Sequence, residues 1–570
     1  MAVLNTRRLQ TTIGGLLDSG QLTSAHWSFE WVDQFAPSPF ASITERAEVT
    51  ALTMSWPVEA NSKPIATRKM RSWVDDFYFR IHISPSVLDL GNVVSDQSSD
   101  IYVWNAWLAP RALAAITGTD EGIIVSGQPV LPLLFPALKE LLFELTVTPN
   151  GQSVLDTIVQ WQFEGGEAAG VHVTAVRIIG WTFVPDWADG ITERLIGSTD
   201  ILQSESAKEQ RRSLRQSLRR EFEAPMFVEG RERQYLDLAL MGWSARTWAL
   251  PIWHEIQLLG EPVPVKALVV PCETEFLDFH VGGLAMLRGE SAFVSETVEI
   301  EEVLADGLQL ARGTQMAWPA GTRLYPVRSA VLSAEPSLTR LTDIAISADV
   351  RFLVTETSDW PAEMPITLYR GYPVFDERPD ESEDLTRTLS RLLLTLDNGS
   401  AMPLYTDTAE RGLAVVGYRW INLGRADRAR VRSFITAMNG RQKAVWMPTH
   451  SDDLHLVDVI TNVATTIDVA YCGYTRFASA APGRRDIRVE LYDGSVFMRR
   501  ITGSSEISGE IEQLAIDSTF GRQILPDDVF RISWLSLFRF DSDTQEIQHQ
   551  TDSEGVASWS TVFREVSDES

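Results

Sequence analysis

The chain has 570 residues, with 50 Lys and Arg against 77 Asp and Glu, and a formal net charge of −27 at pH 7. Hydrophobic residues make up 44% and charged residues 22% of it, which excludes wholesale disorder. No apolar run approaches the about 18 residues of a membrane-spanning helix. The acidic balance argues against nucleic acid as a general partner, and at about 150 residues per domain the length predicts three to four domains.

Residues 1–65 predict an irregular N-terminal arm, because Pro37, Pro39, Pro57 and Pro64 interrupt regular elements. From residue 66 to 185 the pattern changes to short runs rich in Val, Ile and aromatic residues, separated by turn sequences. Six or seven such runs predict an all-β sandwich. The clearest runs are residues 77–83, 100–106, 122–127, 140–147, 157–163 and 171–183.

Within this segment, the stretch from Pro85 to Gly91 is followed by a strand that ends in Trp104-Asn105. On these residues the segment resembles the immunoglobulin-like domains of the major sperm protein kind. The resemblance implies an immunoglobulin-like β-sandwich over residues 66–185. No paired cysteines flank a core Trp, so such a fold would lack the antibody disulfide.

The rest of the chain repeats itself in sequence. Residues 231–242 lead into a Trp- and Pro-containing segment that ends near Pro251, and residues 426–440 lead into a similar segment that ends at Pro448. Residues 426–440 predict a helix that ends at Asn439-Gly440. Its expected apolar stripe consists of Val431, Phe434, Ile435 and Met438.

The similarity continues downstream, where residues 298–306 match 509–517, and the strand 323–331 matches the strand 530–538. A fixed order of similar features indicates a duplicated unit. We expect a first repeat over residues 186–335, a second over 336–555 and an acidic tail over 556–570. The chain is therefore predicted to be mainly β with some α (α+β), with one helix in each repeat.

The second copy carries a further resemblance. Its motifs are residues 417–420, 424–426, the helix, and 440–448 through Asp453-Leu454, together with the basic segments 209–222 and 386–391. On these motifs, residues 190–540 resemble the distal-tail and tail-tip proteins of long-tailed (siphovirus-like) bacteriophages. In that family the proteins are structural and form the ring that joins the tail tube to the central hub and fibres.

The resemblance implies a virion protein of the tail tip, or baseplate, that is assembled in the host cytoplasm and is not an enzyme. Its partners would be further copies of the chain, the tail tube protein, the central hub, other tail-tip proteins and tail fibres. Two tandem ring-forming units would let three chains present six similar surfaces, and a true hexamer is the alternative. Closed rings of this kind arise from head-to-tail interfaces.

Arginines and tryptophans are the candidate interface residues. Planar guanidinium groups suit contacts with acidic loops, and large aromatic side chains suit buried contact area. For the tryptophans, the alternative is core packing within one subunit. For the arginines, the two interpretations are a contact between subunits and an ordinary exposed surface. The candidates are Arg211, Arg212, Arg215, Arg219, Arg220, Trp243, Trp248, Trp253, Trp446 and Trp534.

Other motifs point to no chemistry. The cluster from His450 to His455 is the best metal-like spacing, but a hydrogen-bonding turn explains it better. The acidic run 376–384 is expected to be a solvated loop. Cys272 and Cys472 are expected to be structural thiols, and one bridge between them is the alternative. We find no hydrolase, zinc-protease or phosphate-loop motif and expect no cofactor and no metal.

Two other function classes stay open. A carbohydrate-binding or carbohydrate-active protein would also be β-rich, aromatic-rich and acidic. It would need exposed aromatic platforms on the sandwich, or two carboxylates converging in a groove. A host intracellular scaffold with an immunoglobulin-like domain is the third interpretation, and the internal duplication favours the ring.

Overall fold

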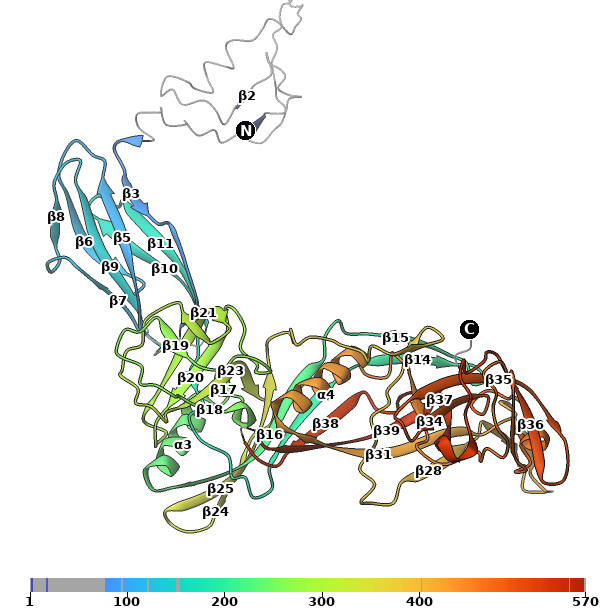
Figure 1. The fold of residues 1–570 in the computed structure, drawn as a ribbon. Coiled ribbons are helices and arrows are strands. Elements are labelled where there is room, and N and C mark those ends of the chain that lie inside the picture. The colour runs from blue at the N-terminus through green and yellow to red at the C-terminus, as the bar shows by residue number, and fades with distance from the viewer. Residues whose placement is uncertain are drawn as a thin grey trace, which may run out of the picture. The chain divides into compact units, whose positions relative to one another are not determined.

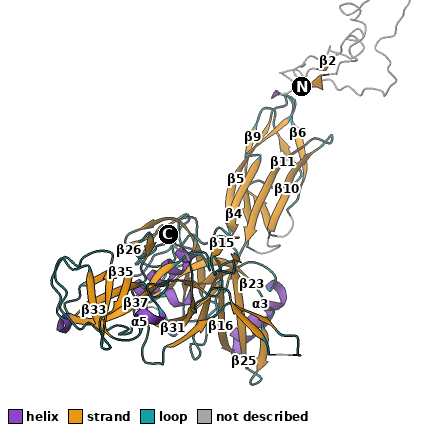
Figure 2. Cartoon of the chain, turned by 90° about the vertical axis from the view of Figure 1, so that its right-hand side faces the viewer, coloured by secondary structure: helices purple, strands orange, loops and turns teal. Residues whose placement is uncertain are grey.

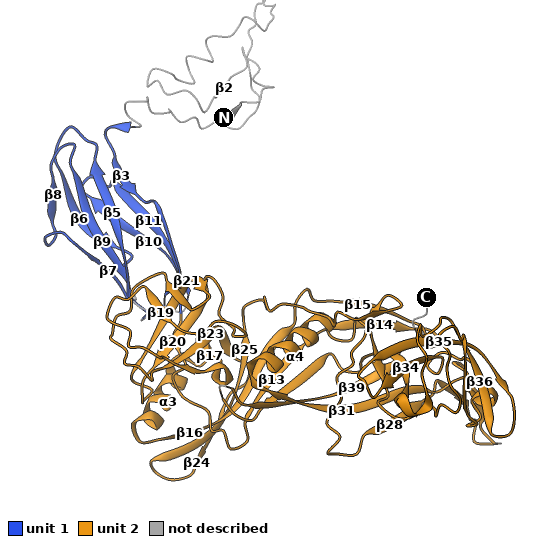
Figure 3. Ribbon diagram, in the orientation of Figure 1, with its two compact units in different colours: residues 1–177 blue, residues 178–570 orange. Residues whose placement is uncertain are grey.

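The computed structural model describes residues 2–3, 17–18, 77–93, 96–119, 122–149, 154–400, 402–552 and 554–567. The chain divides into two compact units, residues 1–177 and residues 178–570 (Figure 3). The N-terminal arm expected over residues 1–65 lies outside the described residues, apart from the paired strands β1 (Ala2–Val3) and β2 (Leu17–Asp18).

Strands dominate both units (Figure 2), which confirms the prediction of a mainly β chain with some helix. In the described part of the chain the α-helices are α3 (Gly230–Trp243), α4 (Gly424–Met438) and the one-turn α5 (Tyr474–Phe477). None of these helices is long and apolar enough to cross a membrane.

The first unit consists of two β-sheets around one apolar core, with strand orders β3-β5-β9-β7 and β4-β11-β10-β6-β8. Inward residues alternate along each strand; on β11, Val171, Val173 and Ala175 are buried. The strands are β3 (Ile81–Ser84), β4 (Val87–Val93), β5 (Gln97–Asn105), β6 (Arg111–Thr117), β7 (Ile123–Ser126), β8 (Leu133–Phe135), β9 (Glu140–Val147), β10 (Val154–Phe163) and β11 (Ala168–Arg177).

The sandwich differs from the sequence prediction in two respects. It contains nine strands among the described residues, and the three outside the named runs are β4, β6 and β8. The Ala-rich β6 and the three-residue β8 give weak strand signals. The predicted run 171–183 is also divided. Its second part, β12 (Ile179–Gly180), pairs in parallel with β17 (Trp248–Pro251) of the second unit. The boundary between the units is therefore at residue 177 and not at 185.

The second unit contains one order of elements twice (Figure 1). Its first series is β13 (Ile191–Ile196), β14 (Thr199–Gln203), β15 (Glu209–Ser213), β16 (Arg219–Glu229), α3, β17, β19 (Val269–Pro271), β20 (Leu284–Arg288), β21 (Ser295–Leu304), β22 (Gly307–Leu310), β23 (Arg323–Leu332), β24 (Ser337–Arg340) and β25 (Ala345–Val354). The second series is β28 (Thr386–Ser390), β29 (Leu393–Leu396), β30 (Leu404–Asp407), β31 (Leu413–Leu423), α4, β32 (Val445–Pro448), β33 (Thr466–Ala470), β34 (Asp486–Leu491), β35 (Val496–Glu506), β36 (Ile511–Ile516), β37 (Val529–Phe540), β38 (Thr544–His549) and β39 (Val556–Glu565). Smaller elements are β18 (Gln257–Leu258), β26 (Leu368–Tyr369), β27 (Tyr372–Pro373) and the 3-10 turns η4 (Trp253–Glu255) and η5 (Pro526–Asp528).

Strand pairing repeats in the same register. Thr192 lies opposite Glu223, and Thr386 lies opposite Gly417, so both members of the second pair follow those of the first by 194 residues (386 − 192). Helices α3 and α4 begin at Gly230 and Gly424 with the same offset. Because long-range pairing and local structure share one offset, each residue of β13–β16 has a defined counterpart in β28–β31.

This pairing corrects the predicted repeat boundaries. Strands β24 and β25 pair with each other, and β25 also pairs with β16 and β23, so the first repeat extends to residue 354 and not to 335. Strand β39 pairs with β31, so the expected acidic tail 556–570 contains the last strand of the second repeat. The predicted match of residues 298–306 with 509–517 is also wrong. The first range lies in β21 and the second in β36, whereas the strand pairing shows that β21 corresponds to β35 and β22 to β36.

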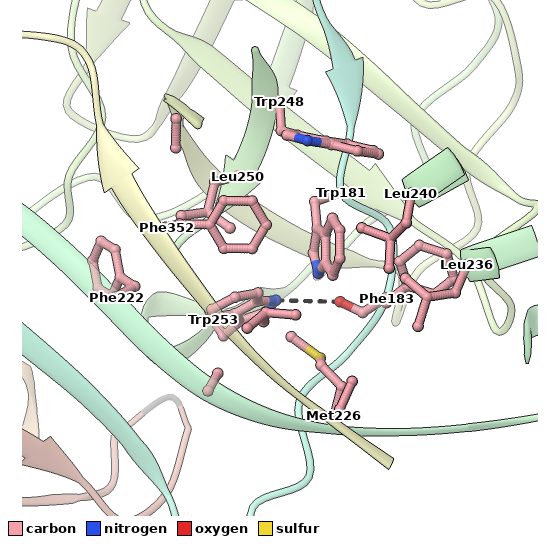
Figure 4. Packing of buried hydrophobic residues seen from close by; sticks show 14 of the residues in the cluster. Trp181, Phe183, Phe222, Met226, Leu236, Leu240, Trp248, Leu250, Trp253 and Phe352 are labelled. Carbon is pink, nitrogen blue, oxygen red and sulfur yellow. Dashed lines mark hydrogen bonds between the residues drawn. The ribbon is translucent and has the colours of Figure 1, made fainter. Parts of the chain in front are cut away.

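Each repeat packs its helix and sheet around an apolar core. In the first, Trp181, Trp248, Trp253 and Phe352 pack edge to face, and the Trp253 indole donates to the Phe183 carbonyl at 3.3 Å (Figure 4). In the second, α4 buries the predicted stripe and ends at Asn439 in the left-handed conformation. The helix prediction is thereby confirmed.

Candidate functional site

The two repeats are joined by an antiparallel ladder between β13 of the first and β38 of the second. Ile191 lies opposite His549 and Ile196 opposite Thr544. The Thr192 hydroxyl donates to the Gln548 side-chain carbonyl at 2.6 Å. Since β13 also pairs with β16, one sheet passes without interruption from one repeat into the other. We call this contact the repeat joint.

The β14–β15 hairpin of the first repeat strengthens the joint by reaching onto the second repeat. The Glu209 carboxylate accepts two bonds from the Arg539 guanidinium, at 2.7 and 2.6 Å. The Asp543 carboxylate accepts from the Thr199 amide at 2.9 Å and from its hydroxyl at 2.7 Å. Paired, bidentate contacts of this type fix orientation as well as distance.

A buried charge cluster lies behind the repeat joint, with the fully buried Glu193 at its centre. Its carboxylate accepts from Arg220 Nε at 2.7 Å and from His549 Nε2 at 2.9 Å, and lies 3.6 Å from Arg432 Nε. Burial alone would raise the pKa of Glu193. The attraction of Arg220 and Arg432 outweighs it and holds this pKa well below its usual range.

Two imidazoles, one from each repeat, stack within the cluster. The rings of His254 and His549 are parallel within 8°, with centroids 3.5 Å apart. Arg432 has only donors, so its 3.2 Å contact makes His254 Nε2 an acceptor. Burial lowers the pKa of His254 to about 3 and also lowers the pKa of His549. Both rings are therefore neutral at neutral pH.

The remaining members balance the charge. Asp278 accepts from Arg220 and, at 2.5 Å, from Arg328, and Glu255 accepts from Arg432 at 2.5 Å. Three buried carboxylates thus face three guanidinium groups, and Arg328 also pairs with the less buried Glu356 and Asp359 at 3.2 and 2.7 Å. Buried ion pairs are tolerated only when they are paired and hydrogen-bonded in this way.

Glu193, His254 and His549 also form a possible metal-ligand set, since their ligand atoms lie within 4.8 Å of one another. One carboxylate and two imidazoles is a donor set that suits zinc. The Glu193 carboxylate is already engaged by two arginines, however, at 2.7 and 3.6 Å. A divalent cation would have to displace or repel these arginines, so the arrangement favours a structural role.

The five candidate arginines do not form one surface. Strand alternation separates them, since Arg212 and Arg219 are exposed whereas Arg220 belongs to the buried cluster. Arg215 donates to the carbonyls of Ile196 and Gly197 at 3.1 and 3.0 Å, and Arg211 lies 4.0 Å from Glu209. The expectation of a subunit contact is therefore wrong for Arg220, which joins repeats within one chain.

The five candidate tryptophans are buried inside the subunit. Their exposed fractions are 8% for Trp243, 1% for Trp248, 2% for Trp253, 7% for Trp446 and 8% for Trp534. They lie on inward positions of strands and helix and fill the cores of the repeats. As anchors for a neighbouring chain these predictions are wrong, because the core of their own subunit already covers them.

The other sequence motifs do not converge on a site. His450 is buried and Asp453 accepts from the Trp534 amide at 2.9 Å, whereas His455 is exposed. The acidic run is a mostly exposed loop, as expected, and two of its members meet basic neighbours: Asp376 pairs with Arg488 and Glu377 with Arg430, each at 2.7 Å. Both cysteines are free thiols.

Glu193 and His549, at the centre of the cluster, are not among the residues predicted from the sequence. The available signal was a charged or polar residue on the apolar face of a strand. Glu193 stands between Ile191 and Leu195, and His549 follows Ile547 by two residues. No protein family model matches the chain, and no curated protein matches it either.

Proposed function

We propose that this chain is a structural component of a bacteriophage tail tip, or baseplate, that forms a ring joining the tail tube to the central hub and fibres. The sequence resemblance over residues 190–540 suggests the biological setting. The observation that carries the proposal is the repeat joint, in which two copies of one unit meet head to tail through β13 and β38. Repeated head-to-tail contacts close into a ring when the rotation from one unit to the next completes a full turn.

A trimer is the stoichiometry that the duplication favours. Each chain supplies two similar units, so three chains supply six, which would match a sixfold tail tube on one side and a threefold hub on the other. A hexamer of chains is the alternative. In either ring the first unit, as an immunoglobulin-like domain, would decorate the periphery or clamp neighbouring tail proteins.

Electron microscopy tests this proposal directly. Negatively stained purified protein should show rings with a central opening and six similar densities around it. Antibodies raised against the chain should label the tail tips of phage particles released from cells that carry its gene. Labelling elsewhere on the particles, or particles that lack the chain, would contradict the proposal.

Carbohydrate binding is a second candidate, because the first unit carries an aromatic cluster outside its core. On β5, Tyr102 and Trp104 alternate with the buried Ile101 and Val103, and the His82 ring stacks on Trp104 with centroids 5.1 Å apart. Half-exposed aromatic faces of this kind suit sugar rings. Binding of the full-length chain to a glycan array, lost in Trp104→Ala, would favour this function. No binding to any glycan would remove it.

A further inference from the structure

The repeat joint leaves two strands without the partners that their counterparts have. Strand β13 pairs with β16 and β38, whereas its counterpart β28 pairs with β31 alone among the described strands. Strand β38 pairs with β39 and β13, whereas its counterpart β24 pairs with β25 alone among them. In Figure 1, β24 lies at the lower left of the second unit and β28 in its right-hand half. Open edges of this kind are templates for pairing with another chain.

The open edges also expose apolar side chains at inward positions. Leu389 corresponds to Leu195, and is 55% exposed where Leu195 is 2% exposed. Leu338 corresponds to Ile547, and is 38% exposed where Ile547 is 2% exposed. Both edges therefore carry side chains suited to a joint that the single chain does not make.

The hairpins show the same contrast. Thr199 on the first hairpin is 6% exposed because the second repeat covers it, whereas its counterpart Leu393 on the β29–β30 hairpin is 50% exposed. The β29–β30 hairpin forms its own two-stranded sheet, which is marginally stable when uncovered in water. Its exposed apolar residues are Leu393, Leu394, Leu396, Met402, Leu404 and Tyr405.

The surface that would receive this hairpin has an apolar residue at one position where the repeat joint has a charged one. Arg539, which holds Glu209 in the repeat joint, has Val331 as its counterpart, because both lie opposite equivalent residues of β25 and β39. By the 194-residue offset Glu209 has Pro403 as its counterpart, so this one ion pair of the repeat joint is replaced by two apolar residues, Pro403 and Val331.

We infer that β28 of one chain pairs antiparallel with β24 of a second copy, and that the β29–β30 hairpin packs on that copy as β14–β15 packs within the chain. This inference rests on the proposed ring and names its joint. In the register transferred from Thr192 opposite Gln548, Thr386 of one chain lies opposite Thr339 of the next. The same register places Thr388 opposite Ser337.

The joint between chains lacks the buried charge cluster. The positions of Glu193 and His549 are taken by Arg387 and Arg340, both exposed in the single chain. Backbone pairing and apolar contacts would therefore hold this joint, and the like charges would weaken it. We expect chain–chain association to be reversible and to depend on protein concentration.

Cysteine cross-linking tests the strands and their register. Directly opposite residues of antiparallel strands have Cα atoms about 4.5–5.5 Å apart, within reach of a disulfide. In a background with Cys272→Ser and Cys472→Ser, oxidation of the Thr386→Cys/Thr339→Cys double variant should give covalent oligomers that end at the ring size. A mixture of the two single variants should give dimers only.

Two matched variants calibrate the experiment. Thr192→Cys/Gln548→Cys should cross-link within one chain without a change in mass, which shows that the oxidation conditions suffice. Thr388→Cys/Thr339→Cys is two residues out of register and should cross-link at least tenfold less. Rings seen by light scattering without cross-links at 386/339 would overturn the inferred joint but leave the ring. Neither rings nor cross-links at any concentration would overturn both.

Discussion

Mild acid should destabilise the second unit, because it contains histidines that are buried in the neutral form. Burial lowers the pKa of His254 and of His450 to about 3, and it lowers the pKa of His549 as well. In the unfolded chain these rings bind protons near pH 6.5. The unfolded state therefore binds more protons below this pH, and folding stability falls as the pH falls.

The magnitude follows from the two printed pKa values. Each group contributes about 1.4 kcal/mol per pH unit between its folded and unfolded pKa. From pH 6.5 to 4.5, His254 and His450 together should remove about 5 kcal/mol, and His549 acts in the same direction. That loss is comparable to the about 5–15 kcal/mol stability of a typical domain. Burial raises the pKa of Asp376 and Glu377, which opposes the loss near pH 4–5.

The assay is urea unfolding followed by Trp fluorescence at half-unit steps from pH 7.5 to 4.5. The quantity compared is the pH slope of the unfolding free energy, so a uniform loss of stability in a variant does not matter. His450→Asn, which suits the left-handed backbone at φ 54°, and His254→Gln should each reduce the slope by about 1.4 kcal/mol per pH unit.

The exposed His455 provides the control, because its ring is in water in both states. His455→Gln reports what a histidine substitution does in itself, and the slopes of the two buried-histidine variants are compared with the slope of this variant. A free energy of unfolding that varies by less than about 1 kcal/mol between pH 7 and 5 would refute the reasoning. So would buried-histidine variants that keep the full slope.

Three further predictions concern the joints. Glu193→Gln leaves Arg220 and Arg432 without the carboxylate that they share, so the free energy of unfolding measured in urea should fall by about 3–5 kcal/mol. The control is Glu383→Gln, at an exposed ion pair, which should lower it by less than about 1 kcal/mol. Equal losses in the two variants would argue against the charge cluster. Gly190→Ala places a Cβ 2.4 Å from the His549 carbonyl oxygen at φ 71°, whereas Gly282→Ala meets nothing within 4 Å at φ 78°. The first should therefore cost at least about 1 kcal/mol more by thermal unfolding, and similar costs would contradict the close approach of β13 and β38. Arg387→Glu replaces repulsion from Arg340 of the next chain by attraction. It should therefore lower, about two- to tenfold, the protein concentration at which light scattering detects association. Weaker association would contradict the inferred pairing.

The sequence carries local information well and long-range pairing poorly. The stripe of α4 and its end at Asn439 follow from a 3.6-residue period and one left-handed cap, both encoded within 15 residues. The duplicated order of elements is also visible, because it repeats local patterns. By contrast, Glu193 and His549 are 356 residues apart, and no local period shows that they meet.

The predicted repeat boundaries were displaced for the same reason, namely that pairing between distant segments is not visible in local sequence. Strand β25 belongs to the first repeat because it pairs with β16, a partner more than a hundred residues earlier. The tryptophans were proposed as possible interface anchors because large aromatic residues suit interfaces and cores equally. Only the packing around Trp248 and Trp253 distinguishes these two uses.

The central claim is that the chain assembles head to tail into a ring, and its absolute mass in solution tests this most directly. Light scattering over a range of concentrations should show the 63.7 kDa chain converting to a closed species of three chains, about 191 kDa (3 × 63.7), with nothing larger at saturation. A species of six chains, about 382 kDa (6 × 63.7), would keep the ring and exclude the trimer. A mass of 63.7 kDa at every concentration, or open-ended growth, would contradict the account.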